Sequence, residues 1–394
     1  MTTDLKASDL KASVFVYPWD VIGDPDAPQR LADLGIGQVT LASAYHSTRA
    51  LTPRHPRHRI VTARHAAVLY PPSERRWAGR ALRPYTQDWV PSLDAYGSAA
   101  EALADAGLSV HSWVVLAHNS RLGDDFPHTS VVNAYGDRYP WAPCIAQPEF
   151  RAYATALAAE AAVRPGAAGT ELESCGWYGF AHLHAHDKVG GVPLGAAAQY
   201  LMSLCFCPTC AEGYAGLGAD PDDLRAAVRA ALAPVWAGEW TAGPDEWADI
   251  EKLLGADLAG ATLSWRGEVA RTFQRDAIRA VRDEAPDGFQ VLLHADPALH
   301  HTGANAGVDP AHILAHADGL VLPGTAGLAA CTPHRRPGTV LAANLPVVAG
   351  MGGSPATLAA DAAVAAALGA TELRLYHAGL ASDADLAAVR FALR

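Results

Sequence analysis

The chain has 394 residues, of which 50% are hydrophobic and 18% charged, a composition that can bury a large core and is neither disordered nor membranous. Its net charge of −11 argues against a nucleic-acid partner, because phosphate binding needs a basic face. We therefore expect a small-molecule saccharide or glycoside as ligand, with no nucleic acid and no membrane as partner. Self-association into a homo-oligomer stays open.

The start of the chain and its cysteines bear on the compartment. Residues 1–11 have no apolar signal-peptide core, and no segment approaches the length of apolar chain that spans a membrane. The chain has six cysteines, and the cluster at 205–210 is typical of thiolates kept reduced for a metal rather than of a secreted disulfide framework. These features predict a cytoplasmic protein.

Short apolar runs alternate with helix-forming segments along the whole chain. The eight runs that we expect as strands are 13–17, 38–43, 109–116, 169–174, 289–294, 319–322, 345–349 and 372–376. Eight β/α units without an internal break predict an α/β protein with a single (β/α)8 TIM-barrel domain over 1–394, whose site lies at the carboxyl ends of the strands. A doubly wound dinucleotide fold is disfavoured, because no G-x-G-x-x-G follows the first run.

The gap between the fourth and fifth strands is unusually long. It predicts an insertion over 175–288 that has helices of its own, at 222–233, 245–254 and 256–282. The start of this insertion also contains the cysteine cluster.

The cysteine cluster has the pattern C-x-C-x2-C at Cys205, Cys207 and Cys210, which can direct three thiolates at one tetrahedral zinc ion. The candidates for a fourth ligand are Cys144, Cys175, Cys331 and the nearby histidines. We favour Cys144, because it lies just before the helix that leads into strand four and therefore on the same rim. The alternative is that these cysteines are buried small hydrophobic residues.

The order of these features resembles the family 42 β-galactosidases of glycoside hydrolase clan A. The shared features are a cysteine followed by a Pro-x-Phe/Tyr-Arg helix, here at 148–151, then a strand that ends in glutamate, then C-x-C-x2-C. The resemblance implies a structural four-cysteine zinc site beside the active site and a role for Glu173 as general acid/base.

The chain departs from that family at two places. It has no carboxylate over 346–353, where the resemblance would place the nucleophile, and Leu172 stands where the family has asparagine before the glutamate. The resemblance therefore implies a sugar-processing barrel with a zinc knuckle, closer to uncharacterised glycoside-hydrolase-like barrels than to the galactosidases themselves.

Two glutamates of strand four share one face. Glu171 and Glu173 both point into the barrel, with Glu171 one layer deeper, where it can meet Arg374 of strand eight as a structural ion pair. Glu173, nearer the rim, is the better general acid/base of a glycosidase, with a loop-anchoring carboxylate as the alternative.

A glycosidase needs a second carboxylate, about 5 Å away in retaining enzymes and roughly 6.5–9.5 Å away in inverting ones. We rank Asp296, after strand five, first because it follows the neighbouring strand, and Asp20, after strand one, second. Either could instead cap a helix.

Other strand ends are rich in aromatic and hydrogen-bonding side chains, which suit a sugar. The candidate substrate-binding residues are Trp19, Tyr45, His46, His118, Asn119, Arg121, Trp177, Tyr178, His184, His294, Tyr376 and His377.

The alternating run His182, His184, His186 and Asp187 supports a rival hypothesis. Such a run can bind a catalytic Zn, Mn or Fe ion, joined by His46, His118 and His294, as in a metal-dependent hydrolase or sugar isomerase. It can equally be a substrate loop. A third reading is a sugar-binding barrel without catalysis, suggested by the missing strand-seven carboxylate. The leading hypothesis is a glycoside hydrolase with Glu173 as its acid.

Overall fold

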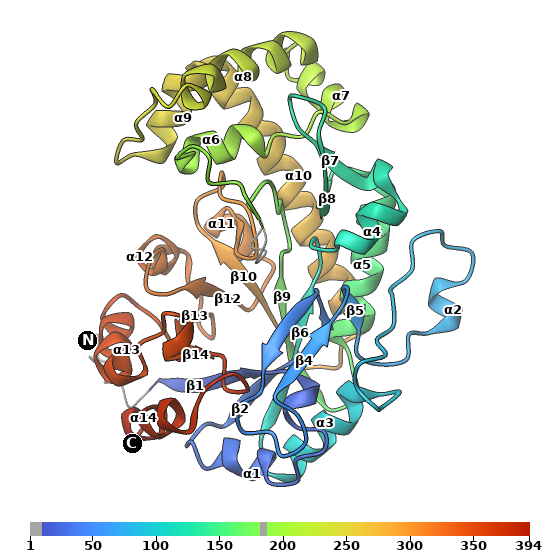
Figure 1. Ribbon diagram of the computed structural model, residues 1–394, viewed down its shortest axis with the longest axis vertical. Helices are drawn as coiled ribbons and strands as arrows, with labels where there is room; N and C mark the ends of the chain where they lie inside the picture. Colours follow the sequence, from blue (N-terminus) through green and yellow to red (C-terminus); the bar gives the residue numbers. More distant parts are fainter. Residues whose placement is uncertain (1–9, 182–186) are drawn as a thin grey trace.

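A closed barrel of eight parallel strands forms the body of the protein in a computed structural model that describes residues 10–181 and 187–394 (Figure 1). Each strand pairs with the next along the chain, and β14 pairs with β1 to close the ring. The barrel strands are β1 (Lys11–Val16), β2 (Gln38–Tyr45), β6 (Ser109–Val115), β9 (Ala167–Glu173), β10 (Gln290–Asp296), β12 (Gly319–Pro323), β13 (Val340–Pro346) and β14 (Glu372–Tyr376). The predicted TIM barrel is confirmed.

The strands are apolar on both faces because one face lines the barrel and the other lies under helices. All residues of β2 are buried, for example. Leu292, Val321, Val340 and Ala342 fill the interior toward the amino ends of the strands. The layers above them are polar and then aromatic, so the chemistry of the barrel lies at its carboxyl end.

Helices surround this barrel and build the insertion (Figure 1). They are α1 (Ala27–Ala32), α2 (Glu74–Trp77), α3 (Ala95–Asp105), α4 (Ser120–Asp125), α5 (Pro148–Ala162), α6 (Gly195–Met202), α7 (Pro208–Gly216), α8 (Pro221–Trp236), α9 (Glu246–Leu254), α10 (Ala256–Arg282), α11 (Pro310–Ile313), α12 (Leu328–Cys331), α13 (Leu358–Ala367) and α14 (Asp383–Ala392). Short 3-10 turns lie at Pro18–Asp20, Pro127–Thr129, Thr332–His334, Ala349–Met351 and Pro355–Thr357. Among the described residues, no helix is both long enough and apolar enough to cross a membrane.

The insertion between β9 and β10 contains α6 to α10, with α6 to α9 gathered at one end of the molecule (Figure 1). The side chain of Asp220 caps α8 by accepting hydrogen bonds from the backbone N–H groups of Asp222 and Asp223. Gly255, with φ of +84°, separates α9 from α10 in a conformation that other residues avoid. The helix α10 then runs back along α5 to the barrel.

Several short strands were not predicted. They are the hairpin β3 (Thr48–Leu51) and β4 (Ile60–Ala63), β5 (Ala67–Val68) against β2, the hairpin β7 (Ser130–Val132) and β8 (Arg138–Pro143), and β11 (Ala306–Gly307) against β10.

The seventh strand was predicted at 345–349, but the observed β13 begins earlier and runs from Val340 to Pro346. It ends at Pro346 because proline has no N–H to continue the hydrogen-bonded ladder. The correction brings Asn344 into register with Arg374 of β14.

Candidate functional site

A buried polar layer in the middle of the barrel is built around Glu171. Its Oε1 accepts a hydrogen bond from Arg374 Nε at 2.5 Å and another from Thr40 at 3.1 Å. Its Oε2 lies 3.2 Å from His294 Nε2. Burial alone would raise the pKa of Glu171, but the charge of Arg374 and the contact with His294 hold it well below its usual range. The predicted structural ion pair between Glu171 and Arg374 is confirmed.

Glu173 lies one layer higher, at the barrel mouth. It is 8% exposed, and its Oε2 accepts a hydrogen bond of 2.7 Å from Trp113 Nε1 on the adjacent strand β6. The chain leaves β9 immediately afterwards through Ser174, whose φ of +53° lies in the left-handed region. This abrupt turn ends the strand at the glutamate and leaves its carboxylate at the mouth.

Three tyrosines lie near enough to that carboxylate for its charge to affect them. Burial raises the pKa values of Tyr45, Tyr178 and Tyr376, and the negative charge of Glu173 raises them further. These phenols therefore stay protonated and can donate hydrogen bonds at neutral pH.

A cluster of aromatic rings forms the floor of the mouth. Trp113 lies 4.8 Å from Phe15 and 4.6 Å from Tyr45, measured between ring centroids. Tyr17 donates a hydrogen bond of 3.1 Å to the hydroxyl of Tyr45 and stacks on His377 at 4.3 Å. These rings are almost fully buried, so the mouth combines one carboxylate with a closely packed aromatic layer and its hydroxyl groups.

A groove of about 380 Å³ opens beside this mouth, at the ends of β2 and β6. Its lining residues are His46, Ser47, Arg64, His65, Ala66, His118, Ser120, Arg121, Asp124 and Asp125. Tyr45 contacts His46 and Tyr178 contacts His118, both with ring centroids 4.1 Å apart. The structure therefore brings the predicted residues His46, His118 and Arg121 together and joins them to the surroundings of Glu173.

Other predicted substrate-binding residues have partners inside the fold. Asn119 Oδ1 accepts the backbone N–H of Leu122 as the cap of α4. Trp177 Nε1 donates to the carbonyl of Arg266, on α10.

Three further candidates from the sequence have little exposed surface. Trp19 stacks on Tyr17 at 4.4 Å, while His294 and His377 are 3% and 0% exposed. Candidate His184, together with His182 and His186 of the rival metal hypothesis, lies outside the described residues.

The two candidate second carboxylates lie in different surroundings. Asp296 ends β10, and its Oδ2 lies 3.0 Å from His301 Nδ1, while its Oδ1 accepts the N–H of Ala298 at 2.9 Å. Burial would raise the pKa of Asp296, but its hydrogen bond to His301 lowers it overall. The same bond raises the pKa of His301 to about 9.

Asp20 lies on the outer side of the first strand end. Its Oδ2 accepts the backbone N–H of Tyr17 at 2.8 Å, and its carboxylate packs so closely on Gly379 that no side chain would fit there. Burial raises the pKa of Asp20 to about 7, against the opposing effects of the Tyr17 hydrogen bond and the charge of Arg54.

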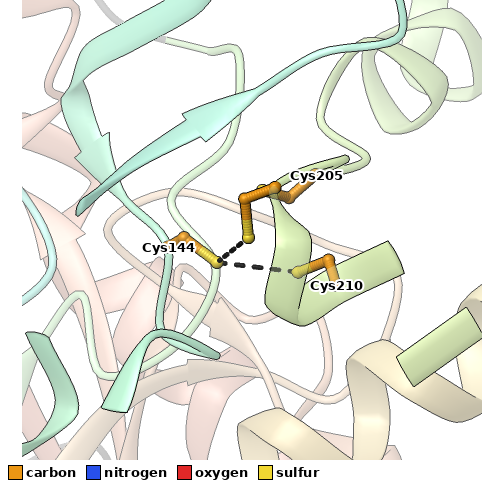
Figure 2. A group of neighbouring side chains, drawn as sticks. Cys144, Cys205 and Cys210 are labelled. Atoms are coloured by element: carbon orange, nitrogen blue, oxygen red, sulfur yellow. Dashed lines mark hydrogen bonds between the residues drawn. The ribbon is translucent and has the colours of Figure 1, made fainter. Parts of the chain in front are cut away.

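The four predicted cysteines come together (Figure 2). Cys144, at the end of the β8 segment, and Cys210, on α7, point toward each other with their sulfur atoms 3.6 Å apart. The Cys144 and Cys207 sulfurs are 3.7 Å apart, and Cys205 completes a group in which all ligand atoms lie within 4.8 Å of one another. A tetrahedron with Zn–S bonds of about 2.3 Å has edges of about 3.8 Å, so the cluster has the dimensions of a metal site.

The electrostatics of these thiols also fit a cation. Burial raises the pKa of the Cys144 thiol well above its ordinary value. Several thiolates could share this buried space only around a positive charge. The two other cysteines, Cys175 and Cys331, are buried elsewhere.

Sequence reasoning missed two residues of the site. Trp113 follows His111 at a spacing of two along the buried strand β6, and this period-two pattern of hydrogen-bonding ring side chains was the available signal. Asn344 lies near the end of β13, where its side-chain oxygen is buried without a hydrogen-bond partner. Asn344 was missed because the predicted seventh strand began only at residue 345.

No family model and no curated protein matches this sequence. Solved structures do resemble it in fold. The glycoside hydrolase domain of PgaB (BpsB) from Bordetella bronchiseptica aligns over 98% of this chain and 99% of its own, with a TM-score of 0.58 and 15% identity. The catalytic domain of β-amylase from Paenibacillus polymyxa aligns over 99% of both chains, with a TM-score of 0.54 and 14% identity.

A third similar structure is α-L-fucosidase isoenzyme 2 from Paenibacillus thiaminolyticus, with a TM-score of 0.57 and 11% identity. That alignment covers 99% of this chain but 49% of the fucosidase, so this chain spans about half of its length. The expected resemblance to glycoside hydrolase barrels is confirmed at the level of the fold.

Proposed function

We propose that this protein is a glycoside hydrolase in which Glu173 is the general acid/base. The observation that carries the proposal is the position of Glu173 at the barrel mouth, oriented by Trp113 and near Tyr45, Tyr178 and Tyr376. Active sites of TIM-barrel enzymes lie at this end of the strands. The similar structures, all of sugar-cleaving enzymes, support the same class.

Asp296 is the second carboxylate in this proposal. His301 favours its ionised form, which a base or nucleophile needs. Leu172 is in register with Leu293, so Glu173 is level with His294 and Asp296 lies two residues further along the neighbouring strand. Strand geometry then separates the two α-carbons by about 8 Å, so both carboxylates can face one ligand at the ends of neighbouring strands. Asp20 faces Gly379 instead and is the weaker candidate.

The sugar would occupy the mouth and extend into the adjacent groove. His46, His118 and Arg121 can hydrogen-bond to hydroxyl groups there, next to the aromatic floor. We further propose that the four cysteines hold a structural zinc ion, since their number, burial and spacing suit tetrahedral thiolate coordination. Zinc would tie the β8 segment to α7 and take no part in the reaction.

The test is a panel of aryl glycosides hydrolysed by the wild type, Glu173→Gln and Glu149→Gln. Removing a general acid should lower kcat by about 10²–10⁴-fold with an unchanged melting temperature. Glu149 lies on the surface and pairs with His128, so its variant should keep full activity. A Glu173→Gln protein that matches the wild type would refute the proposal.

The stereochemistry of the reaction tests the role of Asp296. Proton NMR of the first-formed sugar shows whether its anomeric configuration is that of the substrate. Retention would require the two carboxyl groups to lie about 5 Å apart, and inversion would require roughly 6.5–9.5 Å.

A further inference from the structure

A second group of metal-ligating side chains, separate from the cysteines, lies where the insertion meets the barrel. Glu246 is the first residue of α9, and His300 and His301 lie in the segment that follows β10. Glu246 Oε2 lies 3.0 Å from His300 Nε2 and 2.6 Å from His301 Nε2. The three ligand atoms all lie within 4.8 Å of one another.

The two imidazoles are already aimed at one point. Each directs Nε2 at the same carboxylate oxygen, although the rings belong to consecutive residues and lie at 80° to each other. His300 is further fixed between Tyr200 and Trp247 of the insertion, with ring centroids 6.4 and 5.9 Å away. Converging nitrogens on a rigid support are what a metal ion needs.

Asp296 supplies an independent indication. Its Oδ2 lies 3.0 Å from Nδ1 of His301, on the side of the ring opposite to Glu246. A carboxylate that accepts the Nδ1 proton of a histidine leaves Nε2 as the free ligand nitrogen, and metal-binding histidines almost always have such a partner. The Ala298 N–H in turn orients Asp296.

We propose that Glu246, His300 and His301 bind a divalent transition-metal ion, with Asp296 as the residue that orients His301. Two imidazoles and one carboxylate favour zinc, nickel, cobalt, manganese or iron over calcium and magnesium, which prefer oxygen ligands alone. Three protein ligands leave coordination positions open for water or another small ligand. The ion would join α9 of the insertion to the loop after β10. Asp296 is also the second carboxylate of the proposed glycosidase, but metal binding can be measured without any glycosidase activity.

The test uses the untagged, full-length protein, freed of loosely bound metal by dialysis and titrated with Zn²⁺ or Ni²⁺ in a calorimeter. We expect one equivalent of added metal to bind, beyond any metal retained by the cysteines. His300→Ala, His301→Ala and Glu246→Gln should each abolish this binding. Asp296→Asn should weaken it by about 10–100-fold, the usual effect of removing an orienting partner.

Glu268→Gln is the matched control, because Glu268 is an exposed glutamate of the insertion on α10 rather than on α9. It should bind metal as the wild type does, and Mg²⁺ should not bind. The bound metal should also raise the melting temperature of the wild type and of the control but not of the triad variants. The proposal is refuted if no additional equivalent binds, which would make the cluster an ion pair only, or if the triad variants bind as tightly as the wild type.

Discussion

Glu171 and Glu173 are two carboxylates of one strand with opposite surroundings. Glu171 has a guanidinium, an imidazole and a hydroxyl as partners and no exposed surface. Such a group is held in one protonation state and one position, so it organises the barrel. Glu173 accepts a hydrogen bond from Trp113 and has several uncharged phenols nearby, surroundings that suit the role proposed for it.

Breaking the ion pair of Glu171 should be costly. Arg374→Met would leave a buried carboxylate without its cation, and we expect the free energy of unfolding to fall by about 3–5 kcal/mol in urea denaturation. Arg83→Met, which removes an exposed pair with Glu74, should cost less than about 1 kcal/mol. Equal effects of the two changes would show that the interior pair does not stabilise the barrel.

Asp20 should make stability depend on pH. Its pKa is about 7 in the folded protein, because of burial, and about 3.9 in an unfolded chain. Between about pH 3.9 and about pH 7, this carboxyl group is ionised in the unfolded chain but protonated in the folded protein. The free energy of unfolding therefore falls as pH rises through this range, by at most about 1.4 kcal/mol per pH unit. Asp20→Asn removes this loss and still offers an oxygen to the Tyr17 N–H.

The comparison is made by thermal unfolding from pH 4 to 8. Relative to the wild type, Asp20→Asn should gain stability as pH rises to about 7 and then level off. Asp26→Asn changes an exposed residue of the same segment and should parallel the wild type. Parallel curves for Asp20→Asn as well would contradict the raised pKa.

At the scale of elements, burial decided which strands could be predicted. The barrel strands are covered on both faces and therefore appear as apolar runs, whereas β5 and β11 are two residues long and depend on pairing with distant segments. The seventh strand was predicted too late in the chain. Ala342, Ala343 and Asn344 have weak strand propensity, whereas Val347 and Val348 have strong strand propensity.

The cysteine cluster links the β8 segment to α7, so a metal bound there should matter for stability. We expect the purified wild type to contain one zinc ion per chain by elemental analysis. Cys207→Ser should lose that metal and lower the melting temperature, because the β8 segment and α7 would no longer be joined. Cys175→Ser changes a buried cysteine outside the cluster and should keep the zinc. Wild-type protein without zinc would disprove the assignment.

For the whole molecule, the number of barrel strands and the long insertion followed from patterns within single segments. Even the contact of Glu171 with Arg374 could be predicted, because alternation along a strand fixes which residues point inward. The groove beside Glu173 could not, because segments from β2, β4 and α4 meet there only after the chain folds. The triad of Glu246, His300 and His301 joins residues that are 54 and 55 positions apart, and no local pattern indicates such a meeting.

The helix α10 has a mechanical consequence. It has 27 residues, which gives a rod of about 40 Å, and it packs along α5 at the barrel and against α7 and α9 in the insertion (Figure 1). Helices α6 to α9 are therefore attached to one long continuous helix that also packs against α5 in the barrel wall. A rotation of these helices against the barrel would have to bend α10 or break its contacts with α5, so we expect the insertion to move with the barrel wall as one body.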